Sequence, residues 1–159
     1  MRITDQTGYE VNVEKVNKII SIVPSQTELL VDLGLKTQLA GITKFCIHPK
    51  GLIQEIGHVG GTKNLNLEKI RSLAPDLIIG NKEENTKEQI EELRKEFPVY
   101  LSDINSVEEA FGMIKDLGEL LNVSSPANRL IDQINQERNQ FSKQLNSKRT
   151  CLYFIWKNP

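Results

Sequence analysis

Residues 60–85 have the sequence GGTKNLNLEKIRSLAPDLIIGNKEEN, in which two polar loops flank a helix and a strand. Apolar residues recur at helical spacing behind Asn66, a residue type that accepts a hydrogen bond from the first free amides of a helix. Pro75 cannot continue this helix, and the nearly all-apolar run DLIIG that follows suits a strand buried on both faces of a parallel sheet.

The loop after this predicted strand, residues 81–85, has the sequence NKEEN. Ligands of open α/β sheets bind at the carboxyl ends of the strands, so we expect binding groups in this loop. We also expect the loop 60–63 to lie beside it. Its Gly-Thr-Lys order does not match a Walker motif, which requires Gly-Lys-Ser/Thr, so nucleotide hydrolysis is disfavoured.

Strand and helix patterns alternate along the rest of the chain. An N-terminal hairpin is predicted from residues 2–4 and 9–13, and buried strands are predicted at 19–23, 39–42, 76–80 and 98–101. Capping boxes at Ser25 and Glu28, Thr86 and Gln89, and Ser106 and Glu109 predict three helix starts. The segment 43–56 is expected to be a long loop. This alternation predicts an α/β fold with a doubly wound, mainly parallel sheet.

The C-terminal part of the chain has a different pattern. Ser125 and Pro126 are expected to open a helix that runs to about Asn146, with a narrow apolar stripe typical of a strut on a surface. The run CLYFIW, residues 151–156, predicts a terminal strand. Because an apolar strand needs a partner, we expect it to pair with a symmetry mate or a second copy, which would give a dimer.

Composition excludes several classes of function. The chain has 159 residues, enough for one core, and its 20 basic and 21 acidic side chains leave a net charge of −1, so no global field attracts nucleic acid or anionic membrane. Cys46 and Cys151 are far apart, which indicates neither a disulfide framework nor a zinc knuckle. No apolar run approaches the roughly 20 residues of a membrane helix, and no leader precedes the first residues.

Five motifs occur in a distinctive order: PSQTELLVDLGL (24–35), TKFCIHP (43–49), VGG (59–61), NLNLEKI (64–70) and LAPDLIIGNKEEN (73–85). In order and spacing they resemble the first lobe of the iron-chelate and vitamin B12 binding proteins that serve ABC transporters. The resemblance covers essentially the whole chain but about half of such a protein. It implies a Rossmann-like ligand-binding lobe at 1–124, an interlobe backbone helix at 125–148 and the start of a truncated second lobe at 149–159.

The resemblance implies the substrate-binding component of an ABC importer for a metal chelate, of the ferric siderophore, haem or cobalamin type, which binds and delivers its ligand without chemistry. Its partner would be an ABC permease, and its location periplasmic or extracytoplasmic. Because no leader is seen, cytoplasmic residence stays open, as do removal of a leader and a shortened chain. The alternative is a cytoplasmic α/β enzyme or regulator that binds an anionic small molecule at the same edge of the sheet.

Candidate ligand-binding residues lie in the loops expected to meet at one mouth. They are Lys44, His48, Thr62, Lys63, Asn81, Lys82 and Glu83, together with Trp156, which the resemblance assigns to the cleft from the second lobe. The lysines favour an anionic ligand, unless each is merely a solvated loop residue. Members that hold cobalamin line this cleft with aromatics, whereas Thr62, Asn81 and His48 here leave a smaller or more polar chelate open; Trp156 could equally be an exposed remnant.

Other side chains allow competing readings. Cys46, His48, Glu83 and Glu84 are ligand types for zinc or iron, but their spacing defines no closed site, so we expect a buried Cys46, a loop His48 and no metal site. His48 and His58 are the only histidines, and neither sits in a triad motif, so catalysis is not indicated.

Glu68 has two readings. The resemblance implies that it docks on arginines of the permease, in which case it should be exposed and unpaired. A carboxylate in the first turn of a helix is also favoured by the helix dipole alone.

Overall fold

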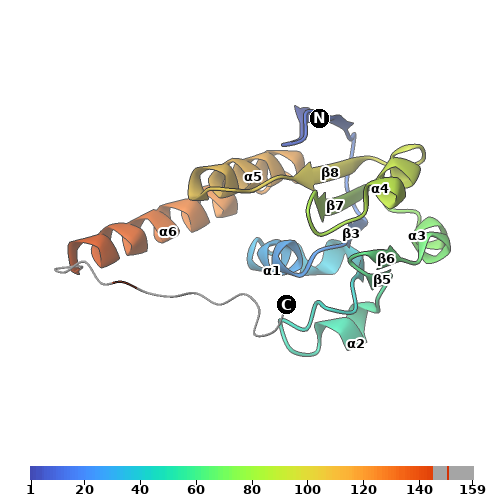
Figure 1. Ribbon diagram of the computed structural model, residues 1–159, viewed down its shortest axis with the longest axis horizontal. Helices are drawn as coiled ribbons and strands as arrows, with labels where there is room; N and C mark the ends of the chain where they lie inside the picture. The colour runs from blue at the N-terminus through green and yellow to red at the C-terminus, as the bar shows by residue number, and fades with distance from the viewer. Residues whose placement is uncertain (145–149, 151–159) are drawn as a thin grey trace.

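The computed structural model describes residues 1–144 and residue 150, and it contains a parallel sheet with helices on both faces (Figure 1). Within these residues the sheet has four strands in the order β4-β3-β7-β8. The strands are β3 (Ile19–Ser21), β4 (Leu39–Ile42), β7 (Leu77–Asn81) and β8 (Val99–Ser102). The predicted α/β class and the four predicted buried strands are confirmed, with ends that shift by at most two residues.

Strand side chains alternate between two cores, which explains the doubly wound arrangement. Leu77 and Ile79 pack in the core that contains side chains of α1 (Pro24–Asp32) and α5 (Val107–Leu120). Ile78 points to the opposite core, which contains side chains of α3 (Leu67–Leu73) and α4 (Lys87–Arg94). All three strand residues are fully buried, so each face of the sheet needs its own layer of helices.

The helix α6 (Ser124–Gln144) packs against α5 and then extends past it, away from the sheet (Figure 1). It begins one residue before the predicted start. The predicted helix end near Asn146, the strand 151–156 and the dimer contact through that strand lie outside the described residues. No helix in the ranges 1–144 and 150 is both long enough and apolar enough to cross a membrane.

The order of the strands defines the position of a crevice. In the sheet, β3 lies between β4 and β7. Helix α1 connects β3 to its neighbour β4, and the chain then passes back across β3 to form β7, the neighbour on the opposite side of β3. The connections that follow β3 and β7 therefore lie on opposite faces of the sheet, and they diverge at the carboxyl ends of these strands. Such a switch point is where open α/β sheets bind ligands. We call the end of the sheet formed by the carboxyl ends of its four strands the carboxyl edge.

Two short features were not predicted. The predicted loop 43–56 contains a helix, α2 (Leu52–Ile56), and the glycine-rich stretch forms a small hairpin of β5 (Gly60–Gly61) and β6 (Asn64–Leu65). Gly60 has a φ of +108°, and a Cβ there would lie 2.4 Å from the carbonyl oxygen of Asn64. A side chain is therefore excluded at this position of the hairpin. The predicted N-terminal hairpin, by contrast, is confirmed as β1 (Arg2–Thr4) and β2 (Glu10–Asn12).

The predicted helix caps are partly wrong. Asn66 and Ser106 do cap α3 and α5, with their side-chain oxygens 2.9 Å and 3.1 Å from the nitrogens of Lys69 and Glu109. The capping box at Ser25 does not form, because Pro24 already occupies the first helical position and Val23 takes the N-cap site. Thr86 is the N-cap of α4, but its hydroxyl bonds to the side chain of Gln89 instead of a backbone amide. The remaining short helix is the 3-10 helix η1 (Lys36–Gln38).

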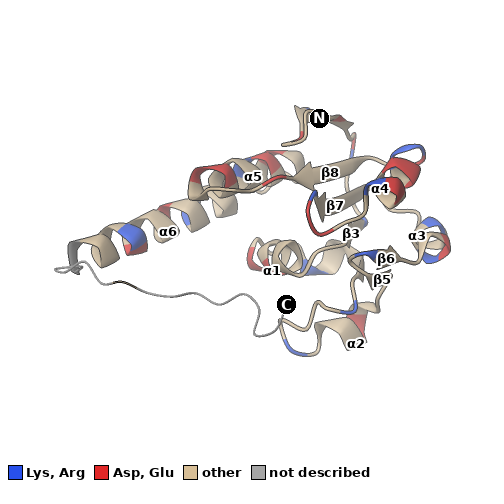
Figure 2. Ribbon diagram, viewed as in Figure 1, with Lys and Arg blue, Asp and Glu red and all other residues tan. Residues whose placement is uncertain are grey.

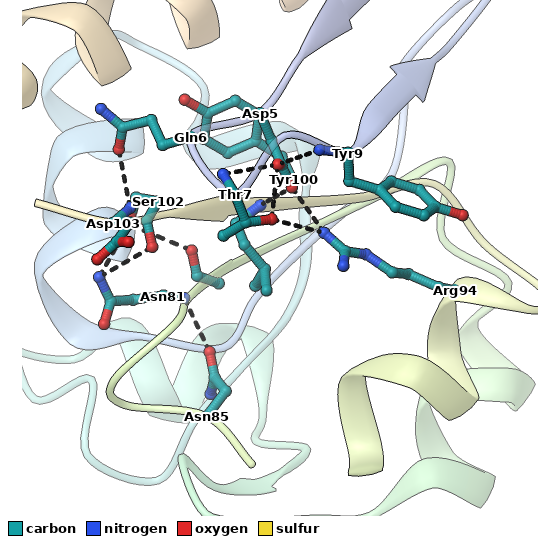
Figure 3. Close-up of polar contacts among 12 residues, drawn as sticks. Asp5, Gln6, Thr7, Tyr9, Asn81, Asn85, Arg94, Tyr100, Ser102 and Asp103 are labelled. Carbon is teal, nitrogen blue, oxygen red and sulfur yellow. Dashed lines mark hydrogen bonds and ion pairs between the residues drawn. The ribbon is translucent and has the colours of Figure 1, made fainter. Parts of the chain in front are cut away.

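The N-terminal hairpin is fastened to the sheet by the carboxylate of Asp5, which is 0% exposed (Figure 3). One oxygen accepts hydrogen bonds from the backbone nitrogens of Thr7 and Tyr9, both at 2.9 Å. The other accepts from the backbone nitrogen of Leu101 at 3.1 Å and from Arg94 at 2.6 Å. The Arg94 guanidinium also stacks on the Tyr9 ring, 3.9 Å from its centre. Strand β8, helix α4 and the hairpin thus share one buried ion pair.

We predict that Asp5→Ala lowers the free energy of unfolding by about 3 kcal/mol, because it leaves Arg94 and buried amides without their acceptor. Chemical denaturation measures this change. The control is Glu10→Ala, which removes an exposed ion pair with Arg2 and is expected to cost less than about 1 kcal/mol. Equal losses in the two variants would contradict the anchoring role of Asp5.

Candidate functional site

The loops of the carboxyl edge are joined by the side-chain amide of Asn85. Its oxygen accepts a hydrogen bond from the backbone nitrogen of Asn81 at 2.9 Å (Figure 3). Its nitrogen donates to the carbonyl oxygens of Ile22 at 3.2 Å and Thr62 at 2.9 Å. One side chain therefore ties the segment after β3, the β5–β6 hairpin and the loop after β7. The expectation that the loop 60–63 lies beside the loop 81–85 is confirmed.

This tether requires close approach of Asn85 to the end of β7. A Cβ at Gly80 would lie 2.6 Å from the side-chain oxygen of Asn85 and 3.0 Å from the side chain of Ile22. Only glycine leaves room for the amide at that point. Asn85 itself is 7% exposed, so its donors and acceptor need these protein partners in place of water.

Asn81 organises the next turn of the same loop. Its side-chain oxygen accepts from the backbone nitrogens of Glu83 at 3.0 Å and Glu84 at 3.1 Å. Its side-chain nitrogen donates to the hydroxyl of Ser102 on β8 at 3.0 Å (Figure 3). The Gln26 amide donates to the same hydroxyl at 2.5 Å. The Asn81 amide is thus bonded within the protein, and these bonds hold the loop in shape.

A pocket of ≈ 410 Å³ opens at the switch point between β3 and β7. It is lined by Val23, Pro24, Ser25, Asn81, Glu84 and Ile104. Helix α1 begins here without a side-chain cap or an acidic residue in its first turn, so no residue of the helix itself compensates the partial positive charge of its N-terminus. The pocket combines apolar walls with a helix end that favours negative charge.

Three predicted ligand-binding residues lie together on the hairpin side of this edge. Thr62 is buried, whereas Lys63 beside it and Lys44 after β4 are exposed. A Cβ at Gly61 would lie 3.4 Å from the Cε of Lys44 and 3.2 Å from the ring of Phe45, so the loop after β4 packs on the hairpin. The Lys44 ammonium lies 5.1 Å from the centre of the Phe45 ring, and since Lys44 is exposed its charge is accessible.

The other predicted residues are less closely associated. Lys82 forms an ion pair with Asp103 at 2.5 Å, and this hydrogen bond raises the pKa of Lys82 above its ordinary value. Its charge is therefore compensated within the lobe. Glu83 and His48 are exposed loop residues, and no contact between them and the hairpin lysines is found among the described residues. Trp156 lies outside the described residues.

Cys46 and His48 face different environments. The Cys46 thiol is buried, 3.1 Å from the hydroxyl of Thr27 and 3.2 Å from that of Thr43, while His48 is exposed. The expectation of a buried Cys46 and a loop His48 is confirmed. In the part of the chain that the structure describes, no three His, Cys, Asp or Glu side chains gather closely enough to hold a metal ion.

The sequence profile described as periplasmic binding protein matches residues 19–158. The chain belongs to the periplasmic binding protein family. An uncharacterized ABC transporter substrate-binding lipoprotein of Bacillus subtilis (strain 168) is 29% identical over 140 residues, which are 85% of this chain and 44% of that protein. The vitamin B12-binding protein of Vibrio parahaemolyticus serotype O3:K6 is 27% identical over 145 residues, or 89% of this chain and 51% of that one.

Solved structures of periplasmic binding proteins share the fold. The vitamin B12 binding protein of Vibrio cholerae has a TM-score of 0.70 and 28% identity, covering 80% of this chain and 51% of that chain. An iron uptake substrate-binding protein from Streptococcus pneumoniae has a TM-score of 0.82 over 93% of this chain and 54% of that chain, and at 21% identity it supports the fold alone. The chain thus spans about half the length of the relatives it matches.

Sequence reasoning missed the apolar side chains that this member of the periplasmic binding protein family exposes at the carboxyl edge. Phe45 is 51% exposed and Ile47 is 63% exposed in the loop after β4, and Ile104 follows β8. On sequence alone, the polar loops of this chain contrast with the aromatic-lined clefts of cobalamin-binding members. That contrast is incomplete, since the accessible ring of Phe45 lies beside the hairpin. An aromatic residue three positions after a buried strand, in an otherwise polar loop, was the signal that could have identified Phe45.

Glu68 lies on α3, away from the pocket, and is 87% exposed, as expected for a docking residue. The prediction that it is unpaired is wrong, because Arg71 bonds to its carboxylate at 2.9 Å. Residues three apart share a helix face, so this pair could have been predicted. Arg71 also donates to Glu96 at 2.8 Å and to Glu92 at 3.1 Å, both near the end of α4. Figure 2 shows that acidic and basic residues make up much of these two helices.

We predict that Asn85→Asp lowers the free energy of unfolding by about 3 kcal/mol, because a carboxylate of the same shape cannot donate to Ile22 and Thr62. Hydrogen exchange should accelerate in the hairpin 60–65 and in the loop 81–85. The control Asn128→Asp makes the same chemical change on the exposed surface of α6 and should alter neither quantity. Unchanged exchange in the Asn85 variant would show that the loops are held by other contacts.

Proposed function

We propose that this chain is the first lobe and connecting helix of the substrate-binding component of an ABC importer for a metal chelate. In this proposal residues 1–124 form the ligand-binding lobe, 125–148 the interlobe backbone helix and 149–159 the start of the second lobe. The protein binds and delivers its ligand without transforming it, and it works in a periplasmic or extracytoplasmic location. Membership of the periplasmic binding protein family supports this role over an enzymatic one.

The observation that carries the proposal is the tethered carboxyl edge. Asn85 holds three loops at a switch point, and their surface is open on the side where a second lobe would close over a ligand. Preformed loops reduce the ordering cost of binding. A long helix such as α6 would keep the two lobes at a nearly constant distance and limit closure to a small rocking motion.

The side chains at this edge support a chelate with negative charge and an apolar periphery, of the ferric siderophore, haem or cobalamin type. Lys44 and Lys63 supply exposed positive charge, while Phe45, Ile47 and Ile104 supply apolar contact area. His48, Thr62, Asn81, Lys82 and Glu83 remain candidates for further contacts from the first lobe, and Trp156 for a contact from the second. Two of the similar proteins reported above are named for vitamin B12 binding.

We predict that the isolated chain binds ferric hydroxamates, ferric catecholates, haem and cobalamin more weakly than about 100 μM, because one lobe leaves half of the ligand surface in water. The full-length protein should bind its ligand at least about 100-fold more tightly. Calorimetric titration of both proteins tests this difference. Equal affinity for the isolated chain and the full-length protein would contradict the two-lobe site.

Glu68 is proposed as the carboxylate that docks on an arginine of the permease. Its exposed position on α3, outside the ligand pocket, separates docking from ligand binding. A surface carboxylate of this kind contributes to partner choice through charge complementarity.

We predict that Glu68→Lys in the full-length protein changes ligand affinity by less than about twofold but reduces uptake through the cognate permease by more than about tenfold, because like charges then oppose each other. Affinity and transport are measured on the same variant. The control Glu108→Lys reverses the charge of another exposed, ion-paired glutamate, on α5, and should transport normally. Normal uptake by Glu68→Lys, or loss of its ligand affinity, would remove Glu68 from the docking role.

A further inference from the structure

Arg71 is the centre of a cluster on the outer surface of α3 and α4, which we call the Arg71 cluster: Arg71, Glu68, Glu92 and Glu96. Each part of the guanidinium bonds to a different carboxylate. Nη1 is 2.9 Å from Glu68, Nη2 is 3.1 Å from Glu92 and Nε is 2.8 Å from Glu96. The first contact lies within α3, and the other two cross to Glu92 on α4 and to Glu96, two residues after the end of α4.

The three contacts are not equivalent. Glu68 is 87% exposed, whereas Glu92 and Glu96 are each 39% exposed, so water screens the Glu68 contact most strongly. The pKa of Arg71 is raised, and the hydrogen bond that it donates to Glu96 is the largest cause, ahead of the one that it donates to Glu68. Because Glu68 is the most exposed of the three, it is the carboxylate that a partner's cation can reach while Arg71 keeps its other two contacts.

Release of Glu68 would leave Arg71 well bound. Its planar fork can keep its bonds to Glu92 and Glu96, an arrangement that the point charge of a lysine cannot reproduce. The segment before α3 has its own attachment, because the side chain of Gln89 on α4 accepts a hydrogen bond from the backbone nitrogen of Leu65. The start of α3 therefore stays in place when Glu68 turns outward.

The cluster also carries an excess of negative charge. Lys95 bonds to Glu92 at 2.7 Å, so two cations face three carboxylates. Since Glu68 is the most exposed of the three, the surplus charge is presented to solvent at that position. A partner that offers a guanidinium complements it.

We propose that Arg71 is the positioning residue for docking: it holds Glu68 in the free protein and passes it to an arginine of the permease, while Glu92 and Glu96 retain Arg71. This inference rests on the docking role proposed above for Glu68. Glu92 and Glu96 then promote docking without touching the partner, because their bonds to Arg71 weaken the ion pair between Arg71 and Glu68.

The double variant Glu92→Gln with Glu96→Gln tests this mechanism in the full-length, ligand-loaded protein. It leaves Arg71 with Glu68 as its one remaining carboxylate in the cluster, so docking on the purified permease in lipid nanodiscs should weaken by about fivefold. The matched control neutralises two exposed, ion-paired glutamates on other surfaces, Glu10→Gln with Glu108→Gln, and should dock as the wild type does. Ligand affinity and thermal unfolding, measured on every variant, report any loss of folding.

The decisive comparison repeats the double variant in an Arg71→Gln background. Without Arg71, neutralising Glu92 and Glu96 should change docking by less than about twofold, because the two glutamates act through Arg71. Equal weakening with and without Arg71 would mean that they touch the permease directly, and no weakening in either background would mean that they have no part in docking; both results overturn the proposal.

Glu68→Gln separates this inference from the proposed function. Normal docking of Glu68→Gln would remove the docking role of Glu68 itself. Weakened docking of Glu68→Gln, combined with normal docking of the Glu92 and Glu96 double variant, would remove only the role assigned to Arg71.

Discussion

The side-chain amide of Asn85 satisfies one backbone amide and two backbone carbonyls that come from three different loops. Without Asn85, each of these three backbone groups would need another hydrogen-bond partner. A buried group left unpaired lowers the stability of the fold. Gly80 gives the amide its space, and Asn81 continues the network to Ser102 on β8. The shape of the carboxyl edge therefore depends on a few amide hydrogen bonds above an apolar sheet.

The charged side chains of this lobe differ in burial and in pairing. Asp5 and Arg94 form a buried pair that fastens the N-terminal hairpin, whereas the Arg71 cluster and the pair of Lys82 with Asp103 lie near the surface. At the carboxyl edge, Lys44 and Lys63 are exposed, and Lys44 lies over an aromatic ring without an acidic partner among the described residues. Positive charge accessible to a ligand is thus concentrated on the hairpin side of the edge.

The main sheet could be predicted from the sequence because its signal is local. Ile78 and Ile79 belong to an apolar run too short for a helix, and they point into opposite cores, as a strand covered on both faces requires. The cap at Asn66 is equally local. The Asn85 tether could not be predicted, since its partners Ile22 and Thr62 are 63 and 23 residues away and no periodicity marks them. The bonds from Arg71 to Glu92 and Glu96 likewise depend on how α3 and α4 meet, whereas the pair with Glu68 follows from helix geometry and was overlooked.

We propose above that a chelate binds at the carboxyl edge, whose loops are tethered by Asn85. Paramagnetic relaxation by a bound ferric chelate tests it directly in the isotopically labelled full-length protein, with the gallium form of the same chelate as the diamagnetic reference. We expect amide signals to broaden in four segments close to the pocket and the hairpin, residues 23–25, 44–48, 61–63 and 81–84. Broadening centred on the outer surface of α3 and α4, or along α5 and α6, with sharp signals at the carboxyl edge, would contradict it.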